Sequence, residues 1–331
     1  MVEPTPSLAD DAAAVTAAAH IARRGLVDRE VLADVVLLCA VAGEHLLVIG
    51  PPGTAKSEAV RRVAGQLGGR YFEYLLGRFT EPNEVFGPVD LQRLREGVVE
   101  IQTGGMLPEA DIAFLDEIFL GSTAILNTLL ALLNERVFRR GSTHLHAPLR
   151  LCVGAANRLP DDPALDAFAD RFLARVFLDA VPDARLEELL ETGRTLDTES
   201  ASAPTRSLLP AVDRLAAASR GVDLAGVRAA YATAVRRLRA AGIRVSDRRV
   251  VRAQRLVAAA AVLDGRLAAG PEDLWVLPVI APTLDAQALA RETLSDLLRT
   301  SRNTGLAHAA EELSRGPLAR AARLAEPPNT C

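Results

Sequence analysis

The residues from Gly50 to Ser57 have types and spacing that suit the binding of a phosphate group. The sequence Gly-Pro-Pro-Gly-Thr-Ala-Lys-Ser is interpreted as the pattern G-x-x-x-x-G-K-[ST], on the strength of Gly50, Gly53, Lys56 and Ser57. Glycines let the backbone curl so that its N–H groups point at a phosphate, and the N-terminus of a following helix adds its positive end. We therefore expect Lys56 to reach the β- and γ-phosphates of a nucleotide and the Ser57 hydroxyl to ligate Mg²⁺.

The chain uses lysine only once, and this lysine lies in the loop. Of the 38 lysine and arginine residues, Lys56 is the only lysine. A compact ammonium suits a tight loop better than the wide planar fork of arginine. Schiff-base enzymes are excluded, because they need a reactive lysine outside such a loop. The Asn/Thr-Lys-x-Asp motif with which GTPases recognise guanine also needs a second lysine and is therefore absent. We predict that the nucleotide is ATP. The residues expected to hold it are Gly50, Pro51, Pro52, Gly53, Thr54, Ala55, Lys56 and Ser57.

Two adjacent carboxylates, Asp116 and Glu117, end a short apolar run that begins after Asp111. Four consecutive apolar residues indicate a buried strand of a parallel sheet. Ligands of open α/β sheets bind just beyond the carboxyl ends of the strands. We therefore expect Asp116 to hold Mg²⁺ through its water shell and Glu117 to orient or deprotonate an attacking water.

Three further polar residues follow in the same part of the chain. Asn157 ends the apolar run 149–156 and could hydrogen-bond the attacking water or the γ-phosphate. Arg171 and Arg175 lie where a helix end is expected to run into a last strand. Paired arginines there suggest a catalytic role, although arginines near helix ends commonly cap the helix or face solvent.

Arg248 lies in the first turn of a helix for which Ser246 is the expected N-cap. A cation in a first turn opposes the helix dipole, so a negative group should compensate it. A phosphate could do so, and the neighbouring Asp247 is the simpler alternative.

The histidines and cysteines do not indicate a metal site. His144 and His146 alternate along one predicted strand, but no third ligand lies near them in the sequence, so we expect a solvated strand face. Cys39, Cys152 and Cys331 are far apart, which predicts neither a disulfide framework nor a zinc site.

The expected elements place these residues in an α/β domain followed by helices. Strands are predicted at 45–49, 70–74, 111–117, 149–157 and before 179, and helices at 11–24, 28–43, 58–67 and 122–135. Residues 80–88 carry two prolines and a glycine and are predicted to form a protruding insertion rather than a plain helix. Residues 136–146 are predicted to form a hairpin, and from about residue 182 the sequence is helical, with a loop at 193–206.

Composition and charge narrow the possible partners. The 331 residues suffice for two domains. A net charge of −4 and a pI near 5.8 argue against binding to nucleic acid through bulk charge. The proline-bearing, acidic N-terminus does not resemble a signal peptide, and no apolar run is long enough to span a bilayer. We expect a cytoplasmic protein without membrane insertion.

Taken together, these residues resemble the AAA+ ATPases, and among them the MoxR family, most closely its RavA-type branch. Gly50–Ser57 resembles Walker A, 114–118 resembles Walker B, and Asn157 resembles sensor 1. The resemblance covers roughly residues 20–300. Its narrower signals are the stretches at 72–74, 78–80 and 84–87, which are similar to an insertion in the second helix of the family, and the Ser-Asp-Arg-Arg element within 245–249. Further matches lie at 125–130, 133–136 and 170–172.

The resemblance implies an αβα P-loop NTPase core with a parallel sheet, a smaller all-helical lid, a homo-hexameric ring and ATP-driven remodelling of client proteins. It also implies a partner with a von Willebrand factor A (vWA) domain. Arg171 would be an arginine finger acting on the next subunit, with Arg175 as the other candidate, and Arg248 would be the sensor 2 residue. The chain ends about thirty residues beyond the lid, so we do not expect partner binding through the extra C-terminal region of the RavA-type branch. The implied domains are an N-terminal arm (1–19), the core (20–182, with an insertion at about 78–90 and a hairpin at about 136–148), the lid (183–300) and a helical tail (301–331).

Two other functions fit the same fold. The client could be nucleic acid, although the acidic pI and the low aromatic content of 4% weigh against base stacking. The protein could also be a nucleotide-gated scaffold with little turnover, against which the presence of Glu117, Asn157 and the candidate fingers argues.

Overall fold

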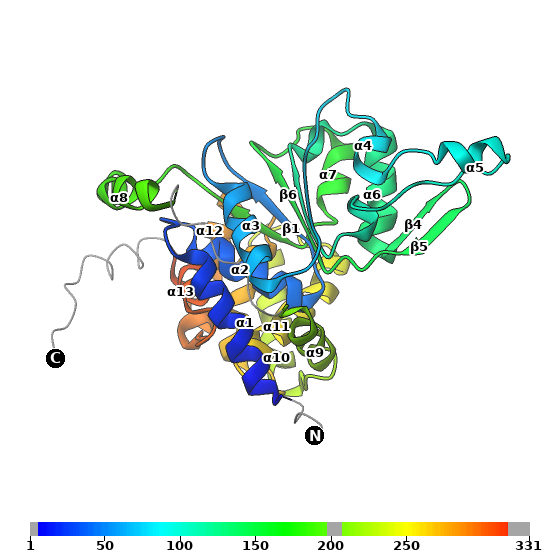
Figure 1. The fold of residues 1–331 in the computed structure, drawn as a ribbon. Helices are drawn as coiled ribbons and strands as arrows, with labels where there is room; N and C mark the ends of the chain where they lie inside the picture. The colour runs from blue at the N-terminus through cyan, green and yellow to red at the C-terminus, as the bar shows by residue number, and fades with distance from the viewer. Residues whose placement is uncertain (1–5, 197–206, 317–331) are drawn as a thin grey trace, which may run out of the picture. The chain divides into compact units, whose positions relative to one another are not determined.

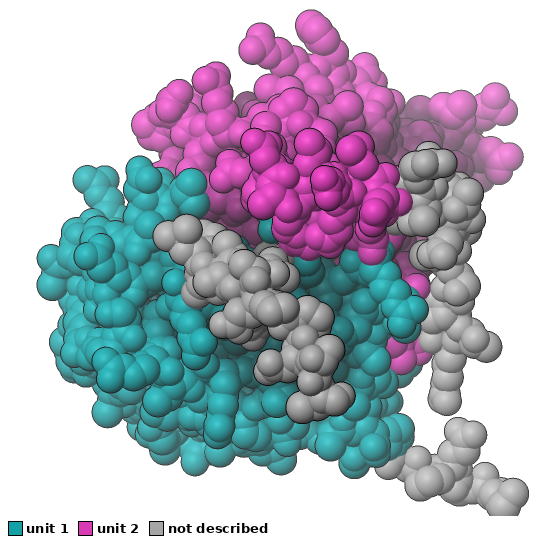
Figure 2. Space-filling view, turned by 90° about the vertical axis from the view of Figure 1, so that its left-hand side faces the viewer, with its two compact units in different colours: residues 1–24, 28–42, 210–331 teal, residues 25–27, 43–209 magenta. Residues whose placement is uncertain are grey.

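The computed structural model describes residues 6–196 and 207–316, and the chain divides into two compact units. We call residues 25–27 and 43–209 the sheet unit, and residues 1–24, 28–42 and 210–331 the helical unit (Figure 2). Each is described by itself. Among the described residues, no helix combines the length and the apolar character needed to cross a membrane.

The sheet unit is built on five parallel strands in the order β2-β3-β6-β1-β7. Two of them, β1 and β6, are labelled in Figure 1. β1 and β6 are buried along their whole length, as is β3 except at its last residue, because helices cover a parallel sheet. The apolar runs seen in the sequence are therefore strands of this sheet. Their bounds are β1 Leu46–Ile49, β2 Tyr71–Leu75, β3 Ile112–Asp116, β6 Leu151–Ala156 and β7 Ala174–Phe177.

The helices of the sheet unit include one that was not expected. Pro82–Phe86 forms the short helix α4, with proline in its first turn, where a missing N–H costs nothing. It ends at Gly87, which has φ of 112° and whose Cβ would lie 2.0 Å from the carbonyl oxygen of Gln102. Residues 80–88 were predicted not to form a plain helix, and the structure has a helix over only the five residues of α4 within this segment. The other elements are α3 Lys56–Leu67, α5 Leu91–Arg95, α6 Thr123–Glu135, α7 Pro163–Ala169 and α8 Leu186–Leu196, the 3₁₀ turns η1 Leu107–Glu109, η2 Ile118–Leu120 and η3 Asp183–Arg185, and the hairpin of β4 Val137–Arg140 and β5 Thr143–His146.

The helical unit joins helices from both ends of the chain. α2 is buried on all sides except at its first residue and packs against α1, α11 and α13. Asp34 of α2 is fully buried, pairs with Arg23 of α1 at 2.6 Å and accepts the N–H of Ala309 of α13 at 3.1 Å. The elements are α1 Leu8–Arg23, α2 Glu30–Ala42, α9 Leu209–Ser219, α10 Ala225–Ala240, α11 Asp247–Leu263, α12 Leu284–Thr293 and α13 Ala307–Arg315, with the 3₁₀ turns η4 Pro271–Val276, η5 Pro278–Ile280 and η6 Leu297–Thr300.

The units divide the chain differently from the boundaries expected from the sequence. Leu8–Arg23 is a helix of the helical unit rather than part of a loose arm, because its buried face packs on α2. Ala307–Arg315 likewise packs on α2 and is not a tail. α8 continues to Leu196, into the predicted 193–206 loop. The rest of that loop, 197–206, and the last part of the predicted tail, 317–331, lie outside the described residues.

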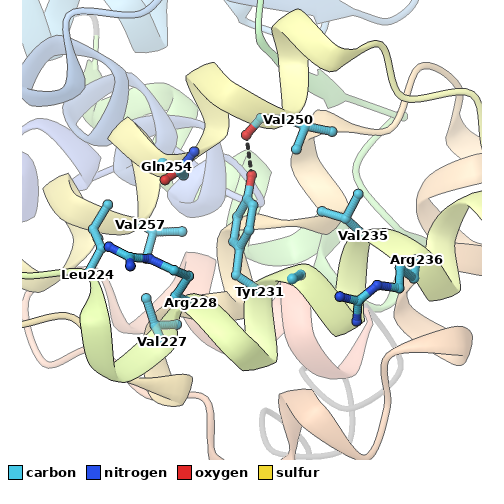
Figure 3. A pocket seen from close by; sticks show the side chains of 10 residues that line it. Leu224, Val227, Arg228, Tyr231, Val235, Arg236, Val250, Gln254 and Val257 are labelled. Carbon is cyan, nitrogen blue, oxygen red and sulfur yellow. Dashed lines mark hydrogen bonds between the residues drawn. The ribbon is translucent and has the colours of Figure 1, made fainter.

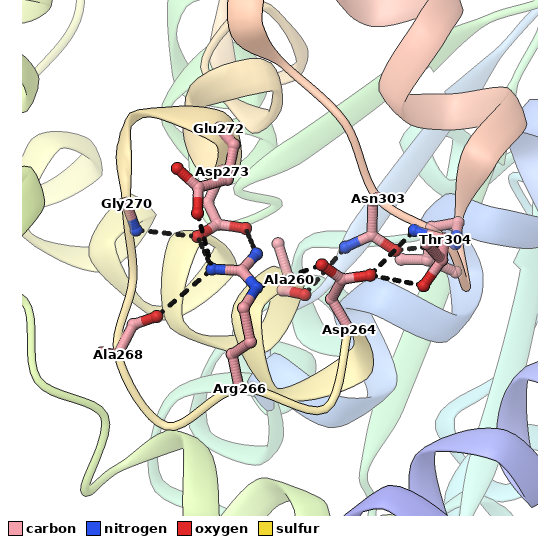
Figure 4. A network of polar contacts seen from close by, with 10 residues as sticks. Ala260, Asp264, Arg266, Ala268, Gly270, Glu272, Asp273, Asn303 and Thr304 are labelled. Carbon is pink, nitrogen blue, oxygen red and sulfur yellow. Dashed lines mark hydrogen bonds and ion pairs between the residues drawn. The ribbon is translucent and has the colours of Figure 1, made fainter.

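An ion-pair network stabilises the segment that follows α11 (Figure 4). The Arg266 guanidinium donates to Asp273 at 2.5 and 3.0 Å and to Asp264 at 3.1 Å. Asp264 in turn accepts from the backbone and hydroxyl of Thr304 at 2.8 and 2.5 Å. Burial raises the pKa of Asp273, and the Arg266 charge opposes that shift. Because Asp273 is fully buried, Arg266 supplies the compensating charge that a buried carboxylate requires.

Candidate active site

The loop that follows β1 has the backbone shape expected of a phosphate loop. Gly50 donates its N–H to Ala156 at 3.1 Å, and a Cβ at Gly50 would lie 2.5 Å from the carbonyl oxygen of Leu178, so only glycine fits. Gly53 has φ of 78° and Ala55 has φ of 55°, both in the left-handed region. The pattern G-x-x-x-x-G-K-[ST] places its second glycine where this chain has Ala55, so the match expected from the sequence is incomplete at that position. The structure retains the glycine-like conformation there at some cost in backbone strain.

Lys56 begins α3 and its ammonium points back into the loop. The side chain is buried, and Nζ donates to the carbonyl oxygens of Gly50 at 2.7 Å and Pro51 at 3.0 Å. A third contact, 3.4 Å long, joins Nζ to Oδ1 of Asn157. These three acceptors match the three protons of an ammonium. A phosphate that binds Lys56 must therefore replace at least one of them, and the long contact to Asn157 is the weakest.

The two carboxylates lie at the end of β3, as predicted. Glu117 has φ of 49°, a strained conformation for this residue type, and its N–H donates to Oδ1 of Asp116 at 2.9 Å. This turn sends the Glu117 side chain toward β6. There Oε1 of Glu117 accepts a hydrogen bond from Nδ2 of Asn157. Asn157 therefore contacts both Lys56 and Glu117.

The strand order explains why these residues meet. β6 lies between β1 and β3, with Ile49 opposite Ala156 and Leu115 opposite Gly154. All three strands are parallel, so the residues that follow them lie at one edge of the sheet. His45, which was not singled out from the sequence, precedes β1 and helps to fix this arrangement: its Nδ1 accepts the N–H of Cys152 in β6 at 3.0 Å. A lone histidine beside an apolar run gives no recognisable sequence signal for that role.

The residues present fit a magnesium ion. Ser57 follows Lys56 in α3 and Asp116 ends β3, and both are only partly buried. Both offer oxygen ligands, which Mg²⁺ prefers. One carboxylate oxygen of Asp116 accepts from Glu117, and the other makes no hydrogen bond within the described chain. By contrast, the described residues contain no group of three or more His, Cys, Asp or Glu side chains that could hold a metal, and His144 and His146 are exposed.

The two candidate finger arginines differ in accessibility. Arg175 lies in β7 opposite Leu47 of β1 and is only 2% exposed, so its side chain is buried. Arg171 follows α7, donates its N–H to Phe168 at 3.0 Å and is partly exposed. Of the two, only Arg171 is placed where it could reach another molecule without unfolding of the sheet.

Arg248 belongs to the helical unit and is the second residue of α11. Ser246 caps this helix as predicted, accepting the N–H of Arg249 at 3.3 Å. Asp247, considered as the charge that might compensate Arg248, pairs with Arg239 at 2.5 Å. The structure therefore groups Lys56, Asp116, Glu117 and Asn157 in one unit, and Arg248 lies in the other.

Comparison with known proteins agrees with this fold. Residues 13–217 match the family described as the MoxR domain in the MoxR-vWA-beta-propeller ternary systems, and residues 224–284 match the AAA lid domain. The parallel sheet with its nucleotide loop and the all-helical C-terminal lid define an AAA+ ATPase fold. The chain belongs to the MoxR family of these ATPases.

Individual proteins are also similar to this chain. Two uncharacterized proteins of Methanocaldococcus jannaschii are each 35% identical, over 246 and 245 residues, which is 74% of this chain. The chain spans 65% and 63% of their lengths. The crystal structure of an ATPase candidate from Cytophaga hutchinsonii superimposes with a TM-score of 0.69 at 18% identity, covering 89% of this chain and 96% of that one, and so shares the fold.

Proposed function

We propose that this protein is an ATP-hydrolysing AAA+ ring ATPase of MoxR type that remodels partner proteins. The observation that carries the proposal is the double contact of Asn157, which lies 3.4 Å from Nζ of Lys56 and donates to Glu117. A residue that contacts both the phosphate-binding lysine and the candidate base lies where the attacking water and the γ-phosphate must meet.

Each residue at the edge of the sheet has a role in this scheme. Gly50–Ser57 and the helix N-terminus of α3 hold the phosphates, with Lys56 as the point charge. Ser57 and Asp116 hold Mg²⁺, which when bound neutralises charge on the phosphates. Glu117 orients and deprotonates the attacking water, and Asn157 keeps the Glu117 carboxylate in place.

Besides Lys56, an arginine from another subunit could stabilise the charge that develops on the transferring phosphoryl group. We propose that Arg171 acts in this way on the neighbouring subunit of a homo-hexamer, because Arg175 is buried. Arg248 of the helical unit is proposed as the sensor 2 residue that contacts the nucleotide. A phosphate near the first turn of α11 would be a favourable counter-charge for this cation.

The partner is proposed to be a protein with a vWA domain. The matched family is described from ternary systems that contain such a domain, which supports this choice. The closer likeness to the RavA-type branch, the role as a chaperone and the cytoplasmic location remain predictions from the sequence.

A hydrolysis assay with candidate clients tests the proposal. Purified protein should release phosphate from ATP only when Mg²⁺ is present, and a vWA-domain protein should change the rate. If single-stranded DNA, and no protein, stimulates hydrolysis in a salt-dependent manner, the client is nucleic acid. If phosphate release stays at background although ATP binds, the protein is a nucleotide-gated scaffold.

A further inference from the structure

A groove between α10 and α11 in the helical unit has no role in the proposed reaction. Its volume is about 380 Å³ (Figure 3). The Tyr231 side chain lies between the two helices, is 7% exposed and donates its hydroxyl to the carbonyl oxygen of Val250. This bond satisfies the one polar atom of the tyrosine, so the groove presents an apolar surface. The other apolar side chains that line it are Leu224, Val227, Ala232, Val235, Val250 and Val257, and the polar Gln254 also lines it.

Two arginines flank this apolar surface. Arg228 and Arg236 lie on either side of Tyr231 (Figure 3), both are exposed, and both line the groove. They are eight residues apart on one helix, which corresponds to about 12 Å along its axis. Within the described chain neither guanidinium makes a hydrogen bond or ion pair. Neighbouring arginines of the same helix do make ion pairs, Arg237 with Asp296 at 2.6 Å and Arg239 with Asp247 at 2.5 Å.

The surrounding sequence strengthens the positive charge. The chain as a whole has a net charge of −4. Between residues 224 and 257, however, the only acidic residue is Asp247, whereas the basic residues are Arg228, Arg236, Arg237, Arg239, Arg244, Arg248, Arg249, Arg252 and Arg255. The groove is therefore an apolar slot within a basic region of an acidic protein.

We propose that this groove binds an amphipathic, acidic segment of a partner protein. An apolar side chain of that segment would enter the slot over Tyr231, and carboxylates on either side would pair with Arg228 and Arg236. Helices commonly bind grooves through apolar anchors one turn apart, and complementary charge selects the partner and speeds its association. A nucleic acid would suit the arginines but not the apolar lining, because Tyr231, the only aromatic side chain that lines the groove, is 7% exposed and offers little surface on which a base could stack. Binding at this groove does not depend on nucleotide hydrolysis.

A designed peptide can test the proposal without knowledge of the natural partner. The probe is a fluorescein-labelled helical peptide of about 16 residues with leucines on one face and glutamates beside them, and its affinity for the full chain is measured by fluorescence anisotropy. Arg228→Glu with Arg236→Glu should weaken binding at least tenfold. A peptide with lysines in place of the glutamates should bind the double variant better than the wild type. Ala232→Leu, which adds volume to the groove lining, should also weaken binding of the glutamate peptide.

Matched controls come from the same unit. Arg220 and Val251 are exposed and do not line the groove, so Arg220→Glu and Val251→Ser should leave the affinity unchanged. Circular dichroism checks that each variant is folded. If Ala232→Leu is unstable, the double variant at the exposed Arg228 and Arg236 still tests the proposal. Equal affinity of the glutamate and lysine peptides for the wild type would overturn the proposal. So would binding of a single-stranded oligonucleotide in place of the peptide, or loss of self-assembly in the double variant, which would mark the groove as an interface between copies of this chain.

Discussion

Nδ2 of Asn157 donates a hydrogen bond to Oε1 of Glu117, and Oδ1 of the same amide lies 3.4 Å from Nζ of Lys56. One side chain thus links the end of β6 to the residue that follows β3 and to the first residue of α3. Because Asn157 contacts both Lys56 and Glu117, its removal should uncouple binding from hydrolysis.

We expect Asn157→Ala to bind ATP but to hydrolyse it about 10²–10³-fold more slowly, in the range seen when one preorganised hydrogen-bond donor is lost. Lys56 keeps its contacts to Gly50 and Pro51 in this variant, so the loop should stay formed. Titration with a fluorescent ATP analogue and a phosphate-release assay measure the two effects. Equal losses of affinity and rate would show that Asn157 acts in binding alone.

Lys56→Ala should abolish ATP binding without unfolding the protein. The ammonium is the only lysine charge in the chain, and it bonds to two loop carbonyls rather than to the hydrophobic core. Loss of those bonds should lower the unfolding free energy by about 1–3 kcal/mol. Calorimetric titration and a melting curve test both parts. Lys56→Arg serves as a control, and its failure to restore binding is expected because a guanidinium does not fit the tight loop. ATP affinity equal to that of the wild type would reject the phosphate loop.

Arg171→Ala should bind ATP and hydrolyse it at least about 10³-fold more slowly, since an arginine finger contributes that much. If Arg171 acts on the neighbouring subunit, mixing this variant with Lys56→Ala should restore activity, because some interfaces then combine an intact Lys56 with an intact Arg171. Arg175→Ala is the comparison: Arg175 is buried in β7, so its loss should lower the melting temperature. Mixed rings that form but remain inactive would contradict the assignment in trans.

The stability of the helical unit should fall as the pH rises from about 4 to 7. Burial raises the pKa of Asp34 to about 7, although Arg23 opposes the shift. The folded state then binds a proton that the unfolded state has lost, so stability is greatest at low pH and decreases as pH approaches the folded pKa. Asp34→Asn should flatten this part of the profile of unfolding free energy against pH. A variant with the slope of the wild type would show that Asp34 is ionised throughout.

The sequence predicted that Asp116 and Glu117 lie at the end of one strand and Asn157 at the end of another, and the structure places them there. Walker-type loops and strand-end carboxylates are local patterns, so Lys56, Asp116, Glu117 and Asn157 could be recognised from the order of residues alone. The left-handed conformation of Ala55 could not, because alanine carries no signal for it. Contacts between residues far apart in the sequence could not be predicted either.

The helical unit gives the clearest example of contacts that the sequence did not predict. The hydrogen bond from Ala309 to Asp34 spans 275 residues. No periodicity in α1 or α2 indicates that these helices pack with the C-terminal ones rather than with the sheet. The apolar character of α2 on all sides does predict that other elements surround it, but not which ones.

The role of Glu117 as the base in ATP hydrolysis is tested most directly by measuring ATP binding and hydrolysis in the same sample of Glu117→Gln. The amide preserves the size of the side chain and can still pair with Asn157, but it cannot accept a proton from water. We predict unchanged ATP affinity together with hydrolysis slowed by orders of magnitude. We also predict a more stable assembly, because ATP stays bound. Hydrolysis at the wild-type rate would contradict this role and would leave Glu117 as a carboxylate that only ends a strand.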